Sequence, residues 1–497
     1  MVSPASGGGD HKSCRGTISN DQGRLKSGKG KDGEHFLKIV IAGAGKIGMA
    51  IASQMCREGH DITLIDRRQD RLNSAVNSLD VIGCCGNCSA LETLAEAEAG
   101  GADLFIAASG FDEANLLACR LSKKLGTKHT VAILRNPEYM ENLDLLKEAL
   151  DLTFSLHPDY VTAEEISRVL QFPAAARVES FPDCEQEIVT FRIEEGCLLS
   201  GLPLRLLPSR FGQKVLVCSV ERNGSCRIPD GDTVLNTGDL ISVTGTSTAL
   251  RRFFTSAGAY KKPVKNVILI GGSRVAVHLA RLLESTGIHV TIIEKDAERC
   301  SYLAENLKSA DIHCADGADT GILQVTGIAW ADGFVTLTGF DEYNIILAMY
   351  AAKMGVGKVL SKVNNQKFMA LLEDVFPDTA VSPQALIAER IAGYVRALSH
   401  ASEKSTIEAL YYLGDPRVTA TEFVVGERAA CAGRKLLELP LRPGILVAAV
   451  IRQGHSFPPD GQTKLEPGDR VIAVTTEHTL LDLDDILTPE SRKERRL

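Results

Sequence analysis

The sequence has few aromatic residues and no long hydrophobic run. Its 497 residues include one tryptophan, and aromatic residues make up 5% of the chain. Bases of single-stranded nucleic acid stack on aromatic side chains, so this scarcity disfavours such a binding platform. The longer apolar stretches, such as ILVAAVI at 445–451, have the length of strands, whereas a membrane-spanning helix needs roughly 20 apolar residues. We therefore expect no membrane span, and a protein that is soluble or reaches a membrane through a partner.

The sequence also has no excess of positive charge. The formal net charge is −8 at pH 7, which argues against a nucleic-acid-binding protein because such proteins normally present a basic face. Hydrophobic residues at 44% and charged residues at 24% are ordinary for a globular protein. A chain of this length predicts roughly three or four domains.

The thirteen cysteines have no regular spacing, so we expect reduced thiols and no disulfide framework. The cluster CCGNC contains Cys84, Cys85 and Cys88. A zinc site needs four ligands, and no second C-x-x-C or histidine pair lies nearby, so no metal site is predicted. A redox pair is an alternative, but small side chains at a strand-to-loop junction are the favoured interpretation.

Both ends of the chain are polar. The first 36 residues are rich in Gly, Ser and Lys, which predicts disorder, and they lack the apolar segment of a secretion signal. This segment is either an extension, a wrongly assigned start or a functional tail. The basic end SRKERRL (491–497) could touch lipid head groups, although a solvated tail is favoured.

The chain repeats itself. Residues 38–66 resemble residues 266–294 at an offset of 228, and ASGFDEANLLACRLSKKLG (108–126) matches LTGFDEYNIILAMYAAKMG (337–355) at an offset of 229. The aligned pairs include Asp112 with Asp341 and Asn115 with Asn344. A frame kept over about ninety residues indicates a duplicated domain.

Each copy alternates strands and helices. In the first copy we expect strands at 38–42, 61–66, near 79–84, 103–108 and 129–134, and helices from about 46, near 89–99 and at 112–125. This alternation predicts an α/β fold with two Rossmann-like, doubly wound parallel sheets. A Pro-led helix follows each copy (157–173 and 382–398), and short alternating strands then predict a small β-rich α+β domain.

The predicted organisation therefore has eight parts. They are a disordered N-terminal extension (1–36), a first Rossmann-like nucleotide-binding domain (37–157), a crossover helix (158–176), a first small domain (177–258), a second Rossmann-like domain (264–381), a second crossover helix and linker (382–410), a second small domain (411–488) and a basic tail (489–497).

The stretch IVIAGAGKIG carries the glycine pattern of a dinucleotide-binding loop. Gly43 permits a tight turn, Gly45 lets the backbone approach a pyrophosphate, and Gly48 lets helix and strand pack closely. The pyrophosphate would lie against the N-terminus of the helix. Asp66, at the end of the second strand, would accept hydrogen bonds from ribose hydroxyls, which favours NAD or an adenosine nucleotide over NADP. The alternative is a glycine turn without a ligand.

Other residues border this site. Lys46 lies in the loop and could reach phosphate oxygens or could simply be solvated. Ser109 and Gly110 follow the fourth strand at the sheet edge where such folds bind ligands. In the second copy Ser273 replaces the second glycine and is expected to weaken or abolish binding, while Glu294 retains the acid.

The sequence lacks a recognisable catalytic domain. A hydride-transfer enzyme needs a general acid or base near the nicotinamide, yet the region 180–258 contains no histidine and no nucleophile–base motif stands out. We therefore interpret the nucleotide as a ligand that is sensed, and the protein as a non-enzyme. The alternatives are an NAD-dependent oxidoreductase with an unidentified substrate and a structural assembly module without ligand.

The module order and the segments GAGKIG, DITLIDRRQDRL, SGFDEANLLACRLSKKLG, LRNPEY and IPDGDTVLNTGDLISVTG resemble the family of Trk-type potassium-uptake regulators. That family carries tandem RCK domains (regulators of potassium conductance), each with a small TrkA-C module. The resemblance covers about residues 38–487. It implies a homo-oligomeric ring, dimeric to tetrameric, on the cytoplasmic face of the plasma membrane. There it would gate a membrane potassium transporter in response to NAD, NADH, ATP or ADP.

The resemblance also implies a set of nucleotide contacts. In the first copy they fall on Gly43, Ala44, Gly45, Lys46, Ile47, Gly48, Asp66, Ser109 and Gly110. The family often has an arginine after the alanine of the fifth strand, where this chain has Ile133, with Arg135 two residues later as the candidate. The corresponding residues of the second copy are Gly271, Gly272, Ser273, Arg274, Val275 and Glu294.

Overall fold

We analysed a computed structural model of the chain. It describes residues 17–18, 36–172, 175–180, 186–212, 214–222, 224–259, 264–365, 367–369, 372, 379–400, 407–412, 418–476, 480 and 482–488. The chain divides into two compact units, one with residues up to Val161 together with Gln384–Ala392, the other with Thr162–Pro383 together with the residues from Gly393. The basic tail and most of the N-terminal extension, with its predicted disorder, lie outside the described residues. The pair Thr17–Ile18 forms β1, antiparallel to β4.

The first copy forms a parallel sheet with the strand order β4-β3-β2-β5-β6-β7, and β1 is added at its edge. The strands are β2 (Lys38–Ala42), β3 (Asp61–Asp66), β4 (Ile82–Cys85), β5 (Leu104–Ala107), β6 (His129–Ile133) and β7 (Phe154–Leu156). The helices are α1 (Lys46–Arg57), α2 (Gln69–Ser78), α3 (Leu91–Glu96), α4 (Asp112–Leu125), α5 (Pro137–Glu141), α6 (Leu143–Leu150) and α7 (Pro158–Gln171). The predicted Rossmann-like doubly wound sheet is confirmed.

Strand β2 is buried on both faces, as expected for a central parallel strand. Val40 and Ala42 belong to the hydrophobic cluster that includes Leu116 and Cys119 of α4. Ile41 points to the other face, because its side chain lies beside Gly48 of α1. Side chains alternate between the faces of a strand, so the continuous apolar run of β2 serves both layers.

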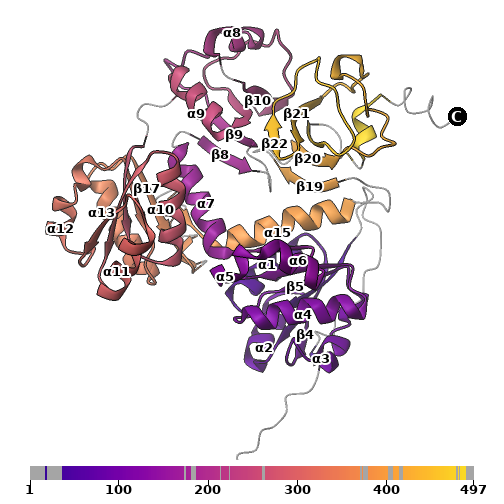
Figure 1. The fold of residues 1–497 in the computed structure, drawn as a ribbon, viewed down its shortest axis with the longest axis vertical. Helices are drawn as coiled ribbons and strands as arrows, with labels where there is room; N and C mark the ends of the chain where they lie inside the picture. Colours follow the sequence, from indigo (N-terminus) through magenta and orange to yellow (C-terminus); the bar gives the residue numbers. More distant parts are fainter. Residues whose placement is uncertain are drawn as a thin grey trace, which may run out of the picture. The chain divides into compact units, whose positions relative to one another are not determined.

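The second copy repeats this arrangement with the strand order β15-β14-β13-β16-β17-β18. Its strands are β13 (Asn266–Ile270), β14 (His289–Glu294), β15 (Asp311–Cys314), β16 (Gly333–Thr336), β17 (Lys358–Lys362) and β18 (Ala380–Val381). Its helices include α10 (Arg274–Ser285), α11 (Ala297–Asn306), α12 (Thr320–Val325) and α13 (Asp341–Lys353), and α15 (Pro383–His400) follows. Helices α10, α11 and α13 are labelled around this sheet in Figure 1.

Some element boundaries differ from the prediction. The third strand is β4 at Ile82–Cys85, and the helix expected near 89–99 is the shorter α3, followed by a 3-10 turn at Ala99–Gly101. Glu98 has a φ of 51°, which a continuing α-helix cannot contain. The helix therefore ends before the Ala-Gly-Gly segment.

Each Rossmann-like domain is followed by an antiparallel β-rich domain. The strand orders are β11-β10-β12-β9-β8 and β19-β20-β23-β21-β22. The first sheet has β8 (Ala175–Ser180), β9 (Gln186–Arg192), β10 (Leu216–Arg222), β11 (Ser225–Arg227) and β12 (Leu240–Thr246). The second has β19 (Ile407–Tyr412), β20 (Thr419–Val424), β21 (Ile445–Arg452), β22 (His455–Phe457) and β23 (Arg470–Thr475).

Both β-rich domains contain the same ion pair. It joins the arginine at the end of β10 or β21 to the aspartate directly before β12 or β23. Arg222 donates to both carboxylate oxygens of Asp239 at 2.7 Å, and Arg452 donates to both oxygens of Asp469 at 2.8 Å. Burial raises the pKa of Asp239, but hydrogen bonds from Arg222 and the backbone outweigh it and hold that pKa below its usual value. Bidentate bonds between arginine and a carboxylate are among the stronger hydrogen bonds in proteins, and buried charges are normally paired in this way. The duplication predicted from sequence thus extends to side-chain contacts.

Among the described helices, none combines the length and the apolar character that crossing a bilayer demands.

Candidate nucleotide-binding site

Two of the three motif glycines of the first copy are required by the fold itself. Gly43 has a φ of 114°, and a Cβ there would lie 2.7 Å from the carbonyl oxygen of Ala108. A Cβ on Gly48 would lie 1.8 Å from the carbonyl oxygen of Gly43. Gly45 differs, because a Cβ built on it meets nothing within 4 Å and its φ is −81°. The chain does not need glycine at position 45, so the open space there is available to a ligand.

Helix α1 begins directly after this open position. Gly45 is its N-cap residue, supplies no side-chain acceptor, and no acidic residue follows in the first turn. The first N–H groups of a helix lack intrahelical partners and carry partial positive charge. Lys46 is exposed beside them, whereas Ile47 is buried. This helix end has the chemistry of an anion site.

Asp66 fastens the glycine loop to the end of β3. Its Oδ2 accepts a hydrogen bond from the amide of Ala44 at 2.8 Å, and its Oδ1 accepts one from the amide of Arg68 at 2.9 Å. The Arg71 guanidinium lies 3.7 Å from the same carboxylate. The acid predicted to meet ribose therefore also positions the loop, and a carboxylate oxygen can accept further hydrogen bonds.

Residues that follow β5 and β6 form the opposite side of the candidate site. The Ser109 hydroxyl donates to Oδ1 of Asn115 at 2.6 Å, and the fully buried Asn115 donates in turn to the carbonyl of Ile133 at 2.8 Å. Arg135 reaches the carbonyl oxygen of Ser109 at 3.2 Å. Ser109, the exposed Gly110 and Arg135 thus lie together at the carboxyl ends of adjacent strands.

Sequence reasoning assigned no role at the site to three residues. Asp112, at the start of α4, accepts hydrogen bonds from the amides of Arg135 and Asn136, both at 2.7 Å. Asn115 connects β5 to β6, and Arg71 faces Asp66. A signal was available, since all three recur in the second copy, as Asp341, Asn344 and Arg299.

The second copy keeps the loop geometry despite its altered glycines. Glu294 accepts hydrogen bonds from the amides of Gly272 at 2.6 Å and Asp296 at 2.9 Å, as Asp66 does in the first copy. Arg299 donates to the carbonyl of Gly272 and lies over the Tyr302 ring, 4.5 Å from its centre. Gly271 has a φ of 96°, matching Gly43.

Ser273 takes the backbone conformation of Gly45 without strain. It is the N-cap residue of α10 with a φ of −65°, and the helix continues into the exposed Arg274 and the buried Val275. The Ser273 hydroxyl makes no hydrogen bond to any described residue. The chain therefore tolerates the extra Cβ of Ser273. The side chain would instead restrict the space open to a ligand at the N-terminus of α10.

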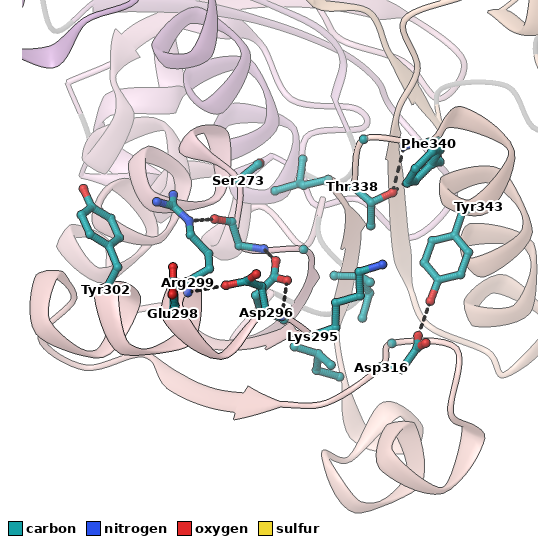
Figure 2. A pocket seen from close by; sticks show the side chains of 18 residues that line it. Ser273, Lys295, Asp296, Glu298, Arg299, Tyr302, Asp316, Thr338, Phe340 and Tyr343 are labelled. Carbon is teal, nitrogen blue, oxygen red and sulfur yellow. Dashed lines mark hydrogen bonds between the residues drawn. The ribbon is translucent and has the colours of Figure 1, made fainter.

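A pocket of about 860 Å³ opens at this edge of the second sheet. Figure 2 shows Arg299 and Tyr302 of α11 on one side, and Thr338, Phe340 and Tyr343 on the other. Tyr343 donates a hydrogen bond to Asp316 at 2.6 Å on that second side. This volume lies within the range of small-molecule sites, which is about 300–1,000 Å³.

The cysteine cluster of the first copy is buried. Burial raises the pKa of Cys84 to about 11, and burial also raises the pKa of Cys88. A reactive thiol needs access to its oxidant, and all three of these cysteines are buried, so packing remains the favoured role. Among the described residues, no group of histidine, cysteine and acidic side chains could hold a metal ion.

Fold and loop geometry together define a tandem Rossmann-type protein with two nucleotide-type loops. Family models match the chain four times, as TrkA-N domains at residues 39–151 and 267–383 and as TrkA-C domains at residues 188–258 and 420–488. The chain therefore belongs to the TrkA-N/TrkA-C family, that of the Trk system potassium uptake proteins.

Named relatives cover nearly the whole chain. The Trk system potassium uptake protein TrkA homolog of Archaeoglobus fulgidus is 28% identical over 451 residues, covering 90% of this chain and 100% of the relative. The Trk system potassium uptake protein TrkA of Vibrio alginolyticus is 29% identical, covering 88% of this chain and 95% of the relative.

Solved structures support the same fold. The GsuK channel bound to NAD has a TM-score of 0.58 at 17% identity, covering 92% of this chain and 78% of that one. The GsuK RCK domain has a TM-score of 0.56 at 17% identity, covering 93% and 94%. The predicted RCK-type architecture is confirmed by these neighbours.

Proposed function

We propose that this protein is a nucleotide-sensing regulatory subunit that gates a membrane potassium uptake transporter. The observation that carries the proposal is the uncapped, open N-terminus of α1 at Gly45, with the loop held by Asp66. An open helix N-terminus suits a pyrophosphate, and a carboxylate at the end of the neighbouring strand suits a ribose. The relatives named as Trk potassium uptake proteins support the transport role.

The first site would hold NAD, NADH, ATP or ADP. The backbone from Gly43 to Gly48 and Lys46 would meet the phosphates, and Asp66 would meet a ribose. Ser109, Gly110 and Arg135 would border the ligand from the other side. In the pocket of the second copy, called the second pocket below, Glu294 and the loop from Gly271 to Val275 would bind a nucleotide more weakly, because the Ser273 side chain narrows the approach to the helix end.

The proposed mechanism is a shift between two states of a homo-oligomeric ring, a dimer to tetramer, attached to the cytoplasmic face of the membrane through the transporter. A ligand shifts such an equilibrium only by its difference in affinity for the two states. The connecting helix α7 is suited to carry the change, since it begins in one compact unit and ends in the other. The nucleotide acts as ligand and not as reagent.

A thermal-shift panel with NADH, NAD, ATP and ADP tests the proposal, with Asp66→Ala as the control. A ligand at 100 times its Kd should add about 2.7 kcal/mol of stability in the original protein, and much less in the variant. Potassium flux through the reconstituted transporter should then change with the same nucleotides. Absence of both responses, or steady NADH turnover with a small substrate, contradicts the proposal.

A further inference from the structure

Two thiols flank Glu294, a residue that lines the pocket of the second copy. Cys300 is on α11, one residue after Arg299, and Cys314 ends β15, where it is the ladder partner of Glu294. The Cys300 thiol donates to the carbonyl oxygen of Glu294 at 3.2 Å. Both cysteines therefore lie beside the residue that anchors the Gly272 loop.

The two cysteines come together at one carbonyl group. The carbonyl oxygen of Glu294 that accepts from Cys300 also accepts from the amide of Ala315 at 2.9 Å, directly after Cys314. Burial raises the pKa of Cys300 to about 11, with a further contribution from its hydrogen bond with Cys314. Among the described cysteines Cys314 is exposed, whereas Cys300 is buried. An accessible thiol in contact with a buried one has the arrangement of an attacking and a resolving cysteine.

We propose that Cys300 and Cys314 form a reversible disulfide that acts as an oxidation-sensitive clamp on the second pocket. The bond would join α11 to the end of β15 and remove the hydrogen bond from Cys300 to Glu294. Arg299 and Glu298, which line the pocket from the same helix (Figure 2), would then be held in a changed position.

The chemistry balances with a hydroperoxide as oxidant. The Cys314 thiol loses its proton, its sulfur attacks one peroxide oxygen, and the O–O bond breaks. The departing hydroxide takes up that proton, so that a sulfenic acid and one water form. The Cys300 thiol then loses its proton, its sulfur attacks the Cys314 sulfur, and the S–O bond breaks to release a second water. Two thiols lose two electrons and two protons, and hydrogen peroxide is reduced to two waters.

The first copy provides an internal comparison. Its Cys85 corresponds to Cys314, because it pairs with Asp66 as Cys314 pairs with Glu294. The position of Cys300 is occupied by Leu72, which is fully buried. The first copy therefore cannot form the equivalent bond, and oxidation would act on the second pocket alone.

The test treats the full chain with hydrogen peroxide, blocks remaining thiols with N-ethylmaleimide, and maps the peptides by mass spectrometry. We expect a peptide pair linked through Cys300 and Cys314 that disappears with dithiothreitol. The variant Cys300→Leu places the first copy's residue at this position, so it should fold and should lack the linked pair. Oxidation of Cys314 without linkage to Cys300 in the original protein overturns the proposal.

A second measurement follows the pocket. Hydrogen exchange of residues 296–303 should slow at least about threefold on oxidation in the original protein and stay unchanged in Cys300→Leu, since a cross-link restricts local opening. Linkage without this change refutes the clamp. A third measurement compares the ADP affinity of the oxidised and reduced second pocket in the Asp66→Ala variant, and this one rests on the proposed function. If ADP binds neither form while the clamp closes, the proposed function fails and the clamp stands.

Discussion

The amide of Ala44 donates a hydrogen bond of 2.8 Å to Oδ2 of Asp66, which joins the glycine loop to the end of the neighbouring strand. The second copy has the same bond between Gly272 and Glu294 at 2.6 Å. In each copy the acid expected to bind ribose is thus a structural support of the phosphate loop. Loss of the acid should affect ligand affinity in two ways, through the lost ribose contact and through the loosened loop.

Gly45 and Gly48 should respond differently to alanine. Gly48→Ala places a Cβ 1.8 Å from a backbone oxygen and should destabilise the first domain by about 1–3 kcal/mol. Gly45→Ala meets no atom of the chain and should cost less than about 1 kcal/mol, yet lower nucleotide affinity at least about tenfold by blocking the ligand. Urea unfolding and calorimetric titration measure the two effects. Unchanged nucleotide affinity in Gly45→Ala would show that the nucleotide does not bind at this helix end.

Ser273→Gly should strengthen nucleotide binding at the second pocket. The fold accommodates the Ser273 side chain without strain, but we expect this side chain to obstruct a phosphate. The substitution removes that obstruction. In the Asp66→Ala background, where the first site is disabled, ADP affinity should rise several-fold, by about 1 kcal/mol or more. Ser273→Ala is the matched control, since it keeps the Cβ and loses the hydroxyl. If both variants bind more weakly than the parent, the Ser273 hydroxyl contributes to binding and its side chain does not obstruct the phosphate.

Asp112→Ala should destabilise the first domain and lower its nucleotide affinity. The buried carboxylate accepts from the amides of Arg135 and Asn136, and each amide left unpaired costs about 1–3 kcal/mol. Asp112→Asn keeps an acceptor oxygen at the same place and should lose less. Urea unfolding followed by circular dichroism measures the difference. Equal stability of the two variants would show that these hydrogen bonds contribute little.

Stability of the first domain should fall on acidification because of His60. Burial lowers the pKa of His60 from 6.5 to about 4, and its Nδ1 accepts a hydrogen bond from the amide of Leu37. The unfolded chain therefore binds a proton that the folded chain excludes, so stability is retained above pH 6.5 and lost as the pH falls toward 4. The loss from this group is about 3 kcal/mol at most.

The histidine prediction is checked by urea unfolding between pH 7 and pH 4. His60→Gln should flatten the pH dependence in this window, because glutamine does not titrate. His455→Gln is the control, since His455 is an exposed residue of a β-rich domain. A His60→Gln curve parallel to that of the original protein would contradict the assignment.

The sequence predicted the architecture because its signals are local. A glycine turn after an apolar run, a Pro-led helix or a change from helical to alternating periodicity depends only on neighbouring residues. The internal repeat added a second line of evidence, because two segments that align at a constant offset over about ninety residues share one fold. The early end of α3 was not predicted, because the left-handed backbone conformation of Glu98 cannot be recognised from its side chain.

The sequence by itself determined that the chain is a duplicated pair of nucleotide-type domains, each followed by a β-rich domain. Only the tertiary structure decided that the fold does not require glycine at position 45 and that Arg135 donates to the carbonyl of Ser109. It also placed both Cys300 and Cys314 beside Glu294. These contacts join residues separated along the chain by whole strands and helices. Parallel strands bring their carboxyl ends to one edge, and only the register of the sheet fixes which side chains meet there.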